Sequence, residues 1–259
     1  MKKIILLIMA FLVMVYCYFG GFTTGDYVDG IEFKDEIVIP ADKRIIALGE
    51  ATHGNKEFQE LKLSIFKKLV EENGVRAFAI EGDFGGCLEV NDYIHGGSGS
   101  TLEAVKKIGF KIYQTKEMMD LIDYMRDYNL SHLDDDINFY GFDMQRTEYL
   151  DKEYSDEDIN LYLKEIKRQN KEVDNSLLRD KYMAQNIEWI LEREDKVFVC
   201  AHNEHVAKWG SYDSMGKLLS LKEENGYYVI GTDFYKSKCN LPFMGKRIVR
   251  TFYSHDPLT

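Results

Sequence analysis

The sequence predicts an α/β fold with a mainly parallel β-sheet flanked by helices and an active-site cleft at the carboxyl ends of the strands. Short, almost continuously apolar runs alternate along the chain with longer stretches of helical periodicity. That alternation is typical of a parallel sheet whose two faces are both covered by helices. Several of the runs also stop at acids or histidines, and such sheets bind their ligands outside the carboxyl ends of the strands.

The first expected strand ends in the most informative motif of the chain. The apolar run Arg44–Ala47 leads directly into Leu48–Gly54, which reads LGEATHG. Glu50 and His53 therefore bring a carboxylate and an imidazole to the carboxyl end of a strand, where a ligand would meet them. We interpret this motif as part of a catalytic site.

Four later runs end in the same way and strengthen that interpretation. If the runs lie parallel in one sheet, their acids and histidines converge on one edge. The runs and the residues that follow them are Ala77–Ile80 before Glu81-Gly82-Asp83, Ile137–Tyr140 before Gly141-Phe142-Asp143, Lys196–Ala201 before His202-Asn203-Glu204-His205, and Tyr227–Gly231 before Thr232-Asp233.

Helical periodicity fills the intervals between the runs. Asn55 can cap a helix that runs to about Asn73 and stops at Gly74. The stretch Glu148–Asp195 is polar and reads as helical throughout. Further helices are expected at Cys87–Ile94, Thr101–Ile108, Lys116–Tyr128 and Ser214–Glu224. Because no repeat or linker interrupts this order, we expect one α/β domain over residues 24–259.

Length and composition limit the class of protein. A chain of 259 residues can form one sizeable domain with its own core. Its net charge of -11 argues against nucleic-acid binding, because phosphate recognition requires a basic face. The four cysteines show no CxxC spacing, so neither a zinc ribbon nor a dithiol redox motif is expected.

The amino terminus predicts a membrane segment within residues 1–23. Lys2 and Lys3 precede Ile4–Phe22, a run of about 19 uncharged and mostly apolar residues, close to the length of one bilayer crossing. With the lysines inside, a single-pass anchor would place the domain outside the cell membrane. Bulky residues such as Tyr16 crowd the possible cleavage sites, so a cleaved signal and a secreted product are the alternative.

Five motifs occur in the order seen in erythromycin esterase-like proteins, and the chain resembles that family from about Lys43 to Phe234. The motifs are Leu48–Gly54, Ala79–Asp83, Tyr140–Gln145, Arg179–Ala184 and Ala201–Val206. Five motifs in order are far more specific than any one of them. The resemblance implies a hydrolase that opens macrolide lactones, a reaction of antibiotic resistance, without a serine nucleophile. We expect a small-molecule ester or lactone substrate and no cofactor or metal.

The resemblance also assigns residues to the site. It places Glu50, His53, Glu81 and His202 in the active site, and His205 is close enough in sequence to join them as a substrate-binding residue. Lys62 stands where the family usually carries an arginine, and we expect it beside the cleft. A snorkelling surface lysine is the alternative at that position. Asp143 is assigned to substrate binding, with a cap or turn role as its alternative.

Two features of the chain depart from the family pattern. The section between Asp143 and Arg179 is shorter than usual, and the chain ends soon after Phe234. In the family those parts normally form walls of the cleft. The sequence therefore predicts the type of reaction more closely than the identity of the substrate.

The residues themselves support ester hydrolysis by an activated water. His53 has a suitable ordinary pKa for the base, and Glu50 or Glu81 can orient its ring. His202 can donate to the oxyanion or to the leaving group. A serine route is unsupported, because Gly96–Gly99 lacks the final glycine of a nucleophile elbow and follows no strand.

Two other functions remain open from the sequence. Glu50 with His53, and His202 with His205, are each spaced by three residues, and carboxylates with imidazoles suit zinc or iron. A metal-dependent hydrolase is therefore one alternative, although neither pair lies in a recognised metallohydrolase motif. The other is a non-catalytic envelope protein that binds a small molecule. His95 and His132 lie in polar loop contexts and are expected on the surface.

Overall fold

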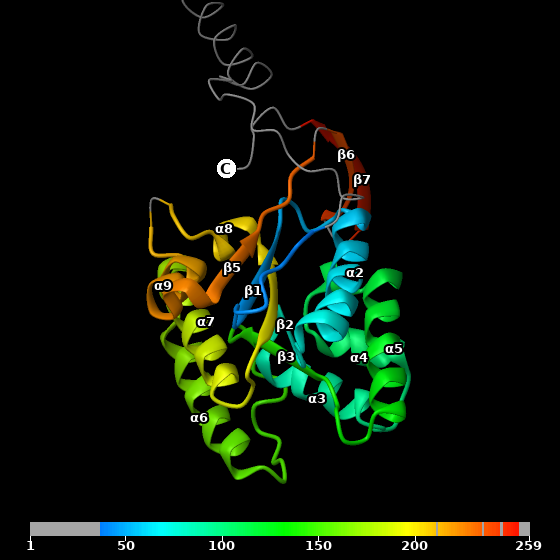
Figure 1. Ribbon diagram of the computed structural model, residues 1–259, viewed down its shortest axis with the longest axis vertical. Coiled ribbons are helices and arrows are strands. Elements are labelled where there is room, and N and C mark those ends of the chain that lie inside the picture. Colours follow the sequence, from blue (N-terminus) through cyan, green and yellow to red (C-terminus); the bar gives the residue numbers. More distant parts are fainter. Residues whose placement is uncertain (1–36, 211, 235, 244–245, 254–259) are drawn as a thin grey trace, which may run out of the picture.

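The computed structural model describes residues 37–210, 212–234, 236–243 and 246–253. Its centre is a five-stranded parallel sheet in the order β3-β2-β4-β1-β5, with helices on both faces (Figure 1). The expected α/β class is confirmed. The expected membrane segment Ile4–Phe22 lies outside the described residues, and within the described ranges no helix has the length and apolarity to cross a bilayer.

All five expected strands are present, and the central ones bury both faces. Every residue of β1 and β2 is buried, as a parallel sheet between two helical layers requires. Strand β4 lies between β1 and β2, so the carboxyl ends of these three strands are neighbours. The strands are β1 (Ile45–Glu50), β2 (Ala77–Asp83), β3 (Asn138–Asp143), β4 (Val197–His202) and β5 (Tyr227–Ile230).

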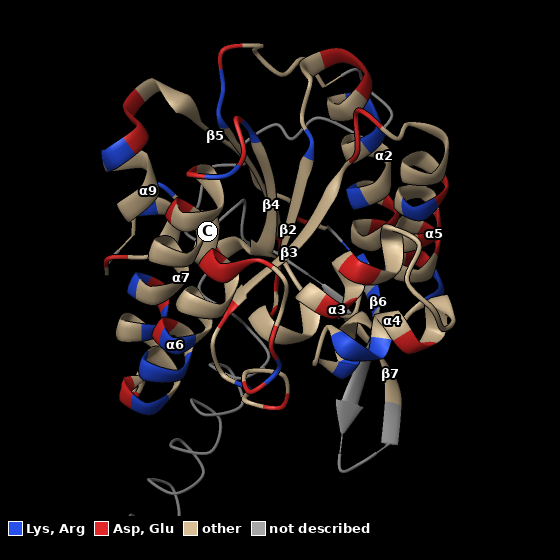
Figure 2. Cartoon of the chain, turned by 90° about the horizontal axis from the view of Figure 1, so that it is seen from below, with Lys and Arg blue, Asp and Glu red and all other residues tan. Residues whose placement is uncertain are grey.

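The helices form two layers with separate apolar cores. One core contains side chains of α2, α4 and α5, the other contains those of α6, α7 and α9, and α3 contributes to both. Figure 2 shows the sheet between these layers, with the charged residues mainly on the outer sides of the helices. The helices are α2 (Lys56–Asn73), α3 (Phe84–Ile94), α4 (Thr101–Lys107), α5 (Lys116–Ser131), α6 (Glu157–Glu172), α7 (Ser176–Leu191), α8 (Asn203–Val206) and α9 (Met215–Glu223), with short 3₁₀ turns η1 (Lys111–Tyr113) and η2 (Glu224–Gly226).

Local capping chemistry explains where the first long helix begins and ends. The Asn55 side chain accepts a hydrogen bond from the backbone N–H of Glu57 at 3.0 Å, which starts α2. Gly74 ends the helix with φ 67°, a left-handed conformation that glycine adopts without strain. Both predicted boundaries of α2 are confirmed.

Other helix boundaries differ from the expectation. The stretch Glu148–Asp195 was predicted helical throughout, but it holds two helices, because Asp156 and Asn175 each cap a new start. Helix α3 begins at Phe84 rather than Cys87, since the Asp83 side chain accepts from the N–H of Gly86 at 2.7 Å.

Aromatic packing fixes α2 over the sheet. The Phe66 ring lies 5.3 Å from that of Phe78 on β2 and 6.1 Å from that of Phe198 on β4, measured between centroids. Such pairs contribute about 0.5–1.5 kcal/mol each beyond the area they bury. Because Lys62 lies about one helical turn before Phe66, this packing also fixes Lys62 above the strand ends.

A second sheet follows the parallel one. Strands β6 (Lys236–Phe243) and β7 (Lys246–Tyr253) pair antiparallel with each other, in a register that places Lys236 opposite Tyr253. The sequence analysis foresaw no strands here. Their sequences mix lysine and arginine with apolar residues and include Pro242, so they lack the continuous apolar run of the five buried strands.

Candidate active site

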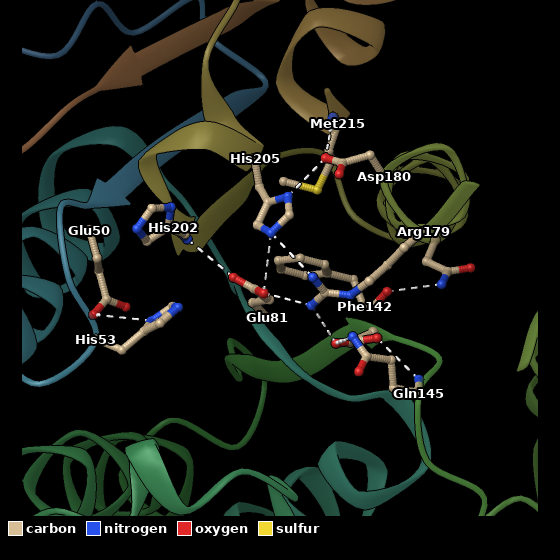
Figure 3. Close-up of polar contacts among 12 residues, drawn as sticks. Glu50, His53, Glu81, Phe142, Gln145, Arg179, Asp180, His202, His205 and Met215 are labelled. Atoms are coloured by element: carbon tan, nitrogen blue, oxygen red, sulfur yellow. Dashed lines mark hydrogen bonds and ion pairs between the residues drawn. The ribbon is translucent and has the colours of Figure 1, made fainter. Parts of the chain in front are cut away.

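The sheet register brings the predicted active-site residues together. Glu50 at the end of β1 is the register partner of His202 at the end of β4. On the other side of β4, Glu81 of β2 accepts a hydrogen bond from the backbone N–H of His202 at 3.1 Å. The ring of His53 lies 5.3 Å from that of His202 between centroids (Figure 3). These four residues thus form one cluster at the edge where a parallel sheet binds its ligands.

His53 is partly buried, and its pKa is lowered. Its side chain is 28% exposed, so solvent reaches the ring, and its Nδ1 atom lies 3.9 Å from Glu50 Oε2. Burial lowers the pKa of His53, although the charges of Glu50 and Glu81 act in the opposite direction. A ring that stays unprotonated near neutral pH can accept a proton.

Glu50 is anchored by two residues of α2. Its carboxylate is fully buried and accepts hydrogen bonds from Gln59 Nε2 at 2.8 Å and from Lys62 Nζ. Lys62 Nζ also donates to Gln59 Oε1 at 2.9 Å and lies 5.2 Å from the centre of the Tyr113 ring. Lys62 is fully buried, so the alternative of a snorkelling surface lysine is wrong. Its ammonium compensates a carboxylate that would otherwise be buried without a counter-charge.

Arg179 is a site residue to which the sequence analysis gave no role. It lies on α7, and its Nη2 atom donates to Glu81 Oε1 at 2.6 Å and to Asp143 Oδ2 at 2.7 Å. Burial opposes ionisation of Glu81, but the charges of His205 and Arg179 hold the pKa of this glutamate below its ordinary value. Burial raises the pKa of Asp143, although Arg179 acts against this rise. Arg179 belongs to the family motif Arg179–Ala184, which could have identified it as a site residue. The motif does not show that the arginine pairs with carboxylates on two strands.

Asp143 therefore does more than cap a turn. It is fully buried, and besides its bond to Arg179 it accepts a hydrogen bond from the backbone N–H of Gln145 at 3.1 Å. The turn role expected as the alternative is present, and substrate binding by Asp143 stays a prediction. Asp143 contacts the site through Arg179, and so it steadies Arg179 rather than facing His53 itself.

His205 lies between two buried carboxylates. Its Nδ1 atom is 2.9 Å from Asp180 Oδ1, and its Nε2 atom is 3.5 Å from Glu81 Oε1 and 3.2 Å from Arg179 Nη1. Burial alone would lower the pKa of His205, but the hydrogen bond to Asp180 and the charge of Glu81 outweigh it and raise that pKa. The pKa values of His53 and His205 thus shift in opposite directions, a pattern that separates a base from an acid.

A backbone brace holds the strand ends. Thr232 Oγ1 donates to the carbonyl of Gly49 at 2.7 Å, and Asn203 Nδ2 donates to the carbonyl of Thr232 at 2.7 Å. A Cβ atom at Gly49 would lie 2.2 Å from Asn203 Oδ1. The glycine of the first motif is therefore required by the close approach of α8 to β1.

Other candidates lie outside this cluster. His95 and His132 are exposed, with His95 paired to Asp136 and His132 stacked on Tyr128, so their predicted surface location is confirmed. Ser98 is exposed in the loop after α3. A hollow of about 730 Å³ lies between α6 and α7 rather than at the strand ends, and its two arginines are already paired with acids.

Across residues 37–210, 212–234, 236–243 and 246–253, no three or more His, Cys, Asp or Glu side chains are grouped so that they could hold a metal ion. Glu50, Glu81 and His205 instead point at Lys62, Arg179 and Asp180.

Comparisons with known proteins agree with the fold and the motifs. The family model described as erythromycin esterase matches residues 70–167 and 157–245. Erythromycin esterase type II of Escherichia coli is 30% identical over 115 residues, which are 44% of this chain and 27% of that protein. The match thus spans well under half of that relative's length.

Two solved structures share the fold. A succinoglycan biosynthesis protein superposes with a TM-score of 0.70 and 23% identity, covering 82% of this chain and 71% of the other. A mutant of the erythromycin esterase EreC in its open conformation superposes with a TM-score of 0.61 and 14% identity, covering 82% and 77%. At these identities the likeness shows the fold alone.

Proposed function

The chain belongs to the erythromycin esterase family, and on this premise we propose that it hydrolyses an ester or lactone bond of a small molecule with a water activated by His53. The observation that carries the proposal is the cluster of Glu50, His53, Glu81 and His202 at the carboxyl edge of the sheet. The lowered pKa of His53 and the raised pKa of His205 are consistent with it. A neutral imidazole can accept a proton from water, and a histidine whose pKa is raised can donate one to the leaving group.

In the proposed first step, His53 removes a proton from water as the oxygen attacks the carbonyl carbon. Negative charge develops on the carbonyl oxygen. The imidazole of His202, which lies beside His53, stabilises that charge. Glu50 stays anchored by Lys62 and stabilises the imidazolium that forms on His53.

In the second step, the carbon–oxygen bond of the ester breaks, and its electron pair stays on the departing alkoxide oxygen. His205 gives that oxygen a proton, so the products are a carboxylic acid and an alcohol. The proton taken by His53 returns through solvent, which restores both rings. Glu81 forms an ion pair with charged His205, because the two side chains lie 3.5 Å apart.

The proposed substrate class follows from the relatives. Two proteins similar to this chain are named erythromycin esterases, so a macrolide lactone is the first candidate, with antibiotic resistance as the consequence. Recognition of the rest of such a substrate depends on loops and helices that vary among proteins of one fold.

The test is hydrolysis by purified full-length protein of a panel of macrolides and simple esters, followed by mass spectrometry for the gain of one water. We expect turnover that His53→Ala reduces by about a hundredfold or more, the scale of a general base. His132→Ala, which removes an exposed histidine at the end of α5, is the matched control and should leave turnover unchanged.

The same assay separates the alternatives. Turnover that a chelator abolishes and added zinc or iron restores would replace the proposal with a metal-dependent hydrolase. Binding of a panel member without any product would identify a non-catalytic binding protein.

A further inference from the structure

Asp180 is a buried carboxylate that the proposed reaction does not use directly. It lies on α7 and is fully buried, next to Arg179 in the chain. Its Oδ1 atom accepts a hydrogen bond from the backbone N–H of Met215 at 2.8 Å and lies 2.9 Å from His205 Nδ1 (Figure 3). Because a carboxylate oxygen accepts, the proton of this second bond lies on Nδ1 of His205.

The other nitrogen of His205 faces two partners of opposite kind. Arg179 Nη1, 3.2 Å away, can only donate a hydrogen bond, and Glu81 Oε1, 3.5 Å away, accepts one. With Nδ1–H fixed by Asp180, a neutral ring accepts from Arg179 through the lone pair of Nε2. A charged ring instead forms an ion pair with Glu81. Nε2 therefore has a donor beside it when the ring is neutral and a carboxylate nearby when the ring is charged.

Charged and titratable groups from several elements surround His205. Glu81 comes from β2, Arg179 and Asp180 come from α7, and Glu204 precedes His205 on α8. Two more groups lie farther out, namely Asp143 behind Arg179 and Tyr212 in the loop before α9. The two carboxylates nearest the ring outweigh burial, and the pKa of His205 rises.

We propose that Asp180 is a positioning residue that holds His205 in its Nδ1–H form and thereby makes Nε2 the atom that delivers the proton to the leaving alkoxide. This inference rests on the proposed ester hydrolysis. The proton moves from Nε2 to the alkoxide oxygen as the carbon–oxygen bond breaks. The ring is left neutral and accepts a hydrogen bond from Arg179 until solvent protonates it again.

The decisive variant is Asp180→Asn in the full-length protein. The asparagine oxygen can still accept from Met215 N–H and from His205 Nδ1–H, so the variant removes the negative charge and keeps the hydrogen bonds. We expect NMR titration to show a lower pKa for His205, and the basic limb of the kcat profile to move to lower pH with it. Above this limb kcat should fall by about tenfold or more.

Two controls accompany it. Glu204→Gln removes a neighbouring carboxylate for which the structure gives no bond to His205, and it should leave the His205 pKa and kcat unchanged. Asp180→Glu keeps the charge, so it should retain a His205 pKa above the ordinary 6.5 even though the oxygen is displaced. This second variant decides the question if Asp180→Asn does not fold.

The outcomes separate three cases. An unchanged His205 pKa in folded Asp180→Asn overturns the proposal, and so does an equal loss of kcat at every pH, which would mark a purely structural role. A wild-type protein that hydrolyses no ester refutes the proposed function. The NMR titration still reports in that case whether Asp180 controls His205.

Discussion

Arg179 on α7 and Glu81 on β2 form an ion pair of 2.6 Å although they are 98 positions apart in the sequence. Both side chains are mostly enclosed, and Arg179 also bonds to buried Asp143. A buried charge without its partner is costly, about 3–5 kcal/mol when one member of a pair is removed. The pair therefore fixes α7, and with it Asp180 and His205, against the ends of the strands.

Glu81→Gln should lower kcat by about a hundredfold or more, because the variant loses the charge that faces both His53 and His205. Arg179 keeps Asp143 as a carboxylate partner, so we expect the variant to fold. Turnover measured beside circular dichroism checks both statements. Near-normal kcat in the folded variant would remove Glu81 from the mechanism.

Lys62→Arg should preserve or raise kcat/KM, whereas Lys62→Met should lower it and also lower stability. Methionine leaves the fully buried carboxylate of Glu50 without a cation, at a cost of about 3–5 kcal/mol. Lys67→Met on the exposed side of the same helix is the control: it loses only a cation–π contact with Tyr124, worth about 0.5–1 kcal/mol, and should leave kcat/KM unchanged. Equal kcat/KM for lysine, arginine and methionine in folded proteins would leave Lys62 no part in catalysis.

The plot of kcat against pH should be bell-shaped, with its maximum near neutral pH. The base His53 has a lowered pKa, so activity should be lost only as pH falls below the ordinary histidine value of 6.5. The acid His205 has a raised pKa, so activity should be lost as pH rises above 6.5. The profile of kcat against pH checks this. A variant without His53 should lose the acidic limb, and a variant without His205 should lose the basic limb. If each variant instead loses the other limb, the two histidines have the opposite roles.

Tyr113→Phe should leave the free energy of unfolding unchanged or raise it by up to about 1 kcal/mol. The Tyr113 hydroxyl is fully buried and has no hydrogen-bond partner among the described residues, so its removal relieves an unpaired polar group. Tyr227→Phe is the matched control, because the buried hydroxyl of Tyr227 donates to the Val206 carbonyl at 2.7 Å. Its loss should cost about 1 kcal/mol. Denaturant unfolding of both variants decides, and a clear loss of stability in Tyr113→Phe would contradict the expectation.

The location of the domain stays a prediction from the sequence. Ile4–Phe22, preceded by Lys2 and Lys3, should hold the full-length chain in the cell membrane with the domain outside. Fractionation of cells that express the full-length chain, followed by protease treatment from outside, measures this. A shortened protein in the medium would support the secreted alternative.

The sequence by itself determined the class of fold and the edge of the sheet where the site lies. Continuous apolar runs report strands buried on both faces, and the residues that follow them must lie at the carboxyl end. It also determined local features such as the cap at Asn55 and the stop at Gly74, because these depend on neighbours a few residues away. Glu50, His53, Glu81 and His202 were therefore named correctly as one cluster in space.

Only the tertiary structure decided which charges meet. Lys62 could have reached solvent along its helix, and nothing local distinguishes that from its bond to Glu50, 12 positions away. The pairing of Arg179 with Glu81 and Asp143 depends on how α7 packs across two strands. Tyr113 lies in a three-residue turn with no periodicity to reveal its burial beside His53. Burial and partner geometry set the pKa of each histidine, and both arise only when distant segments pack together.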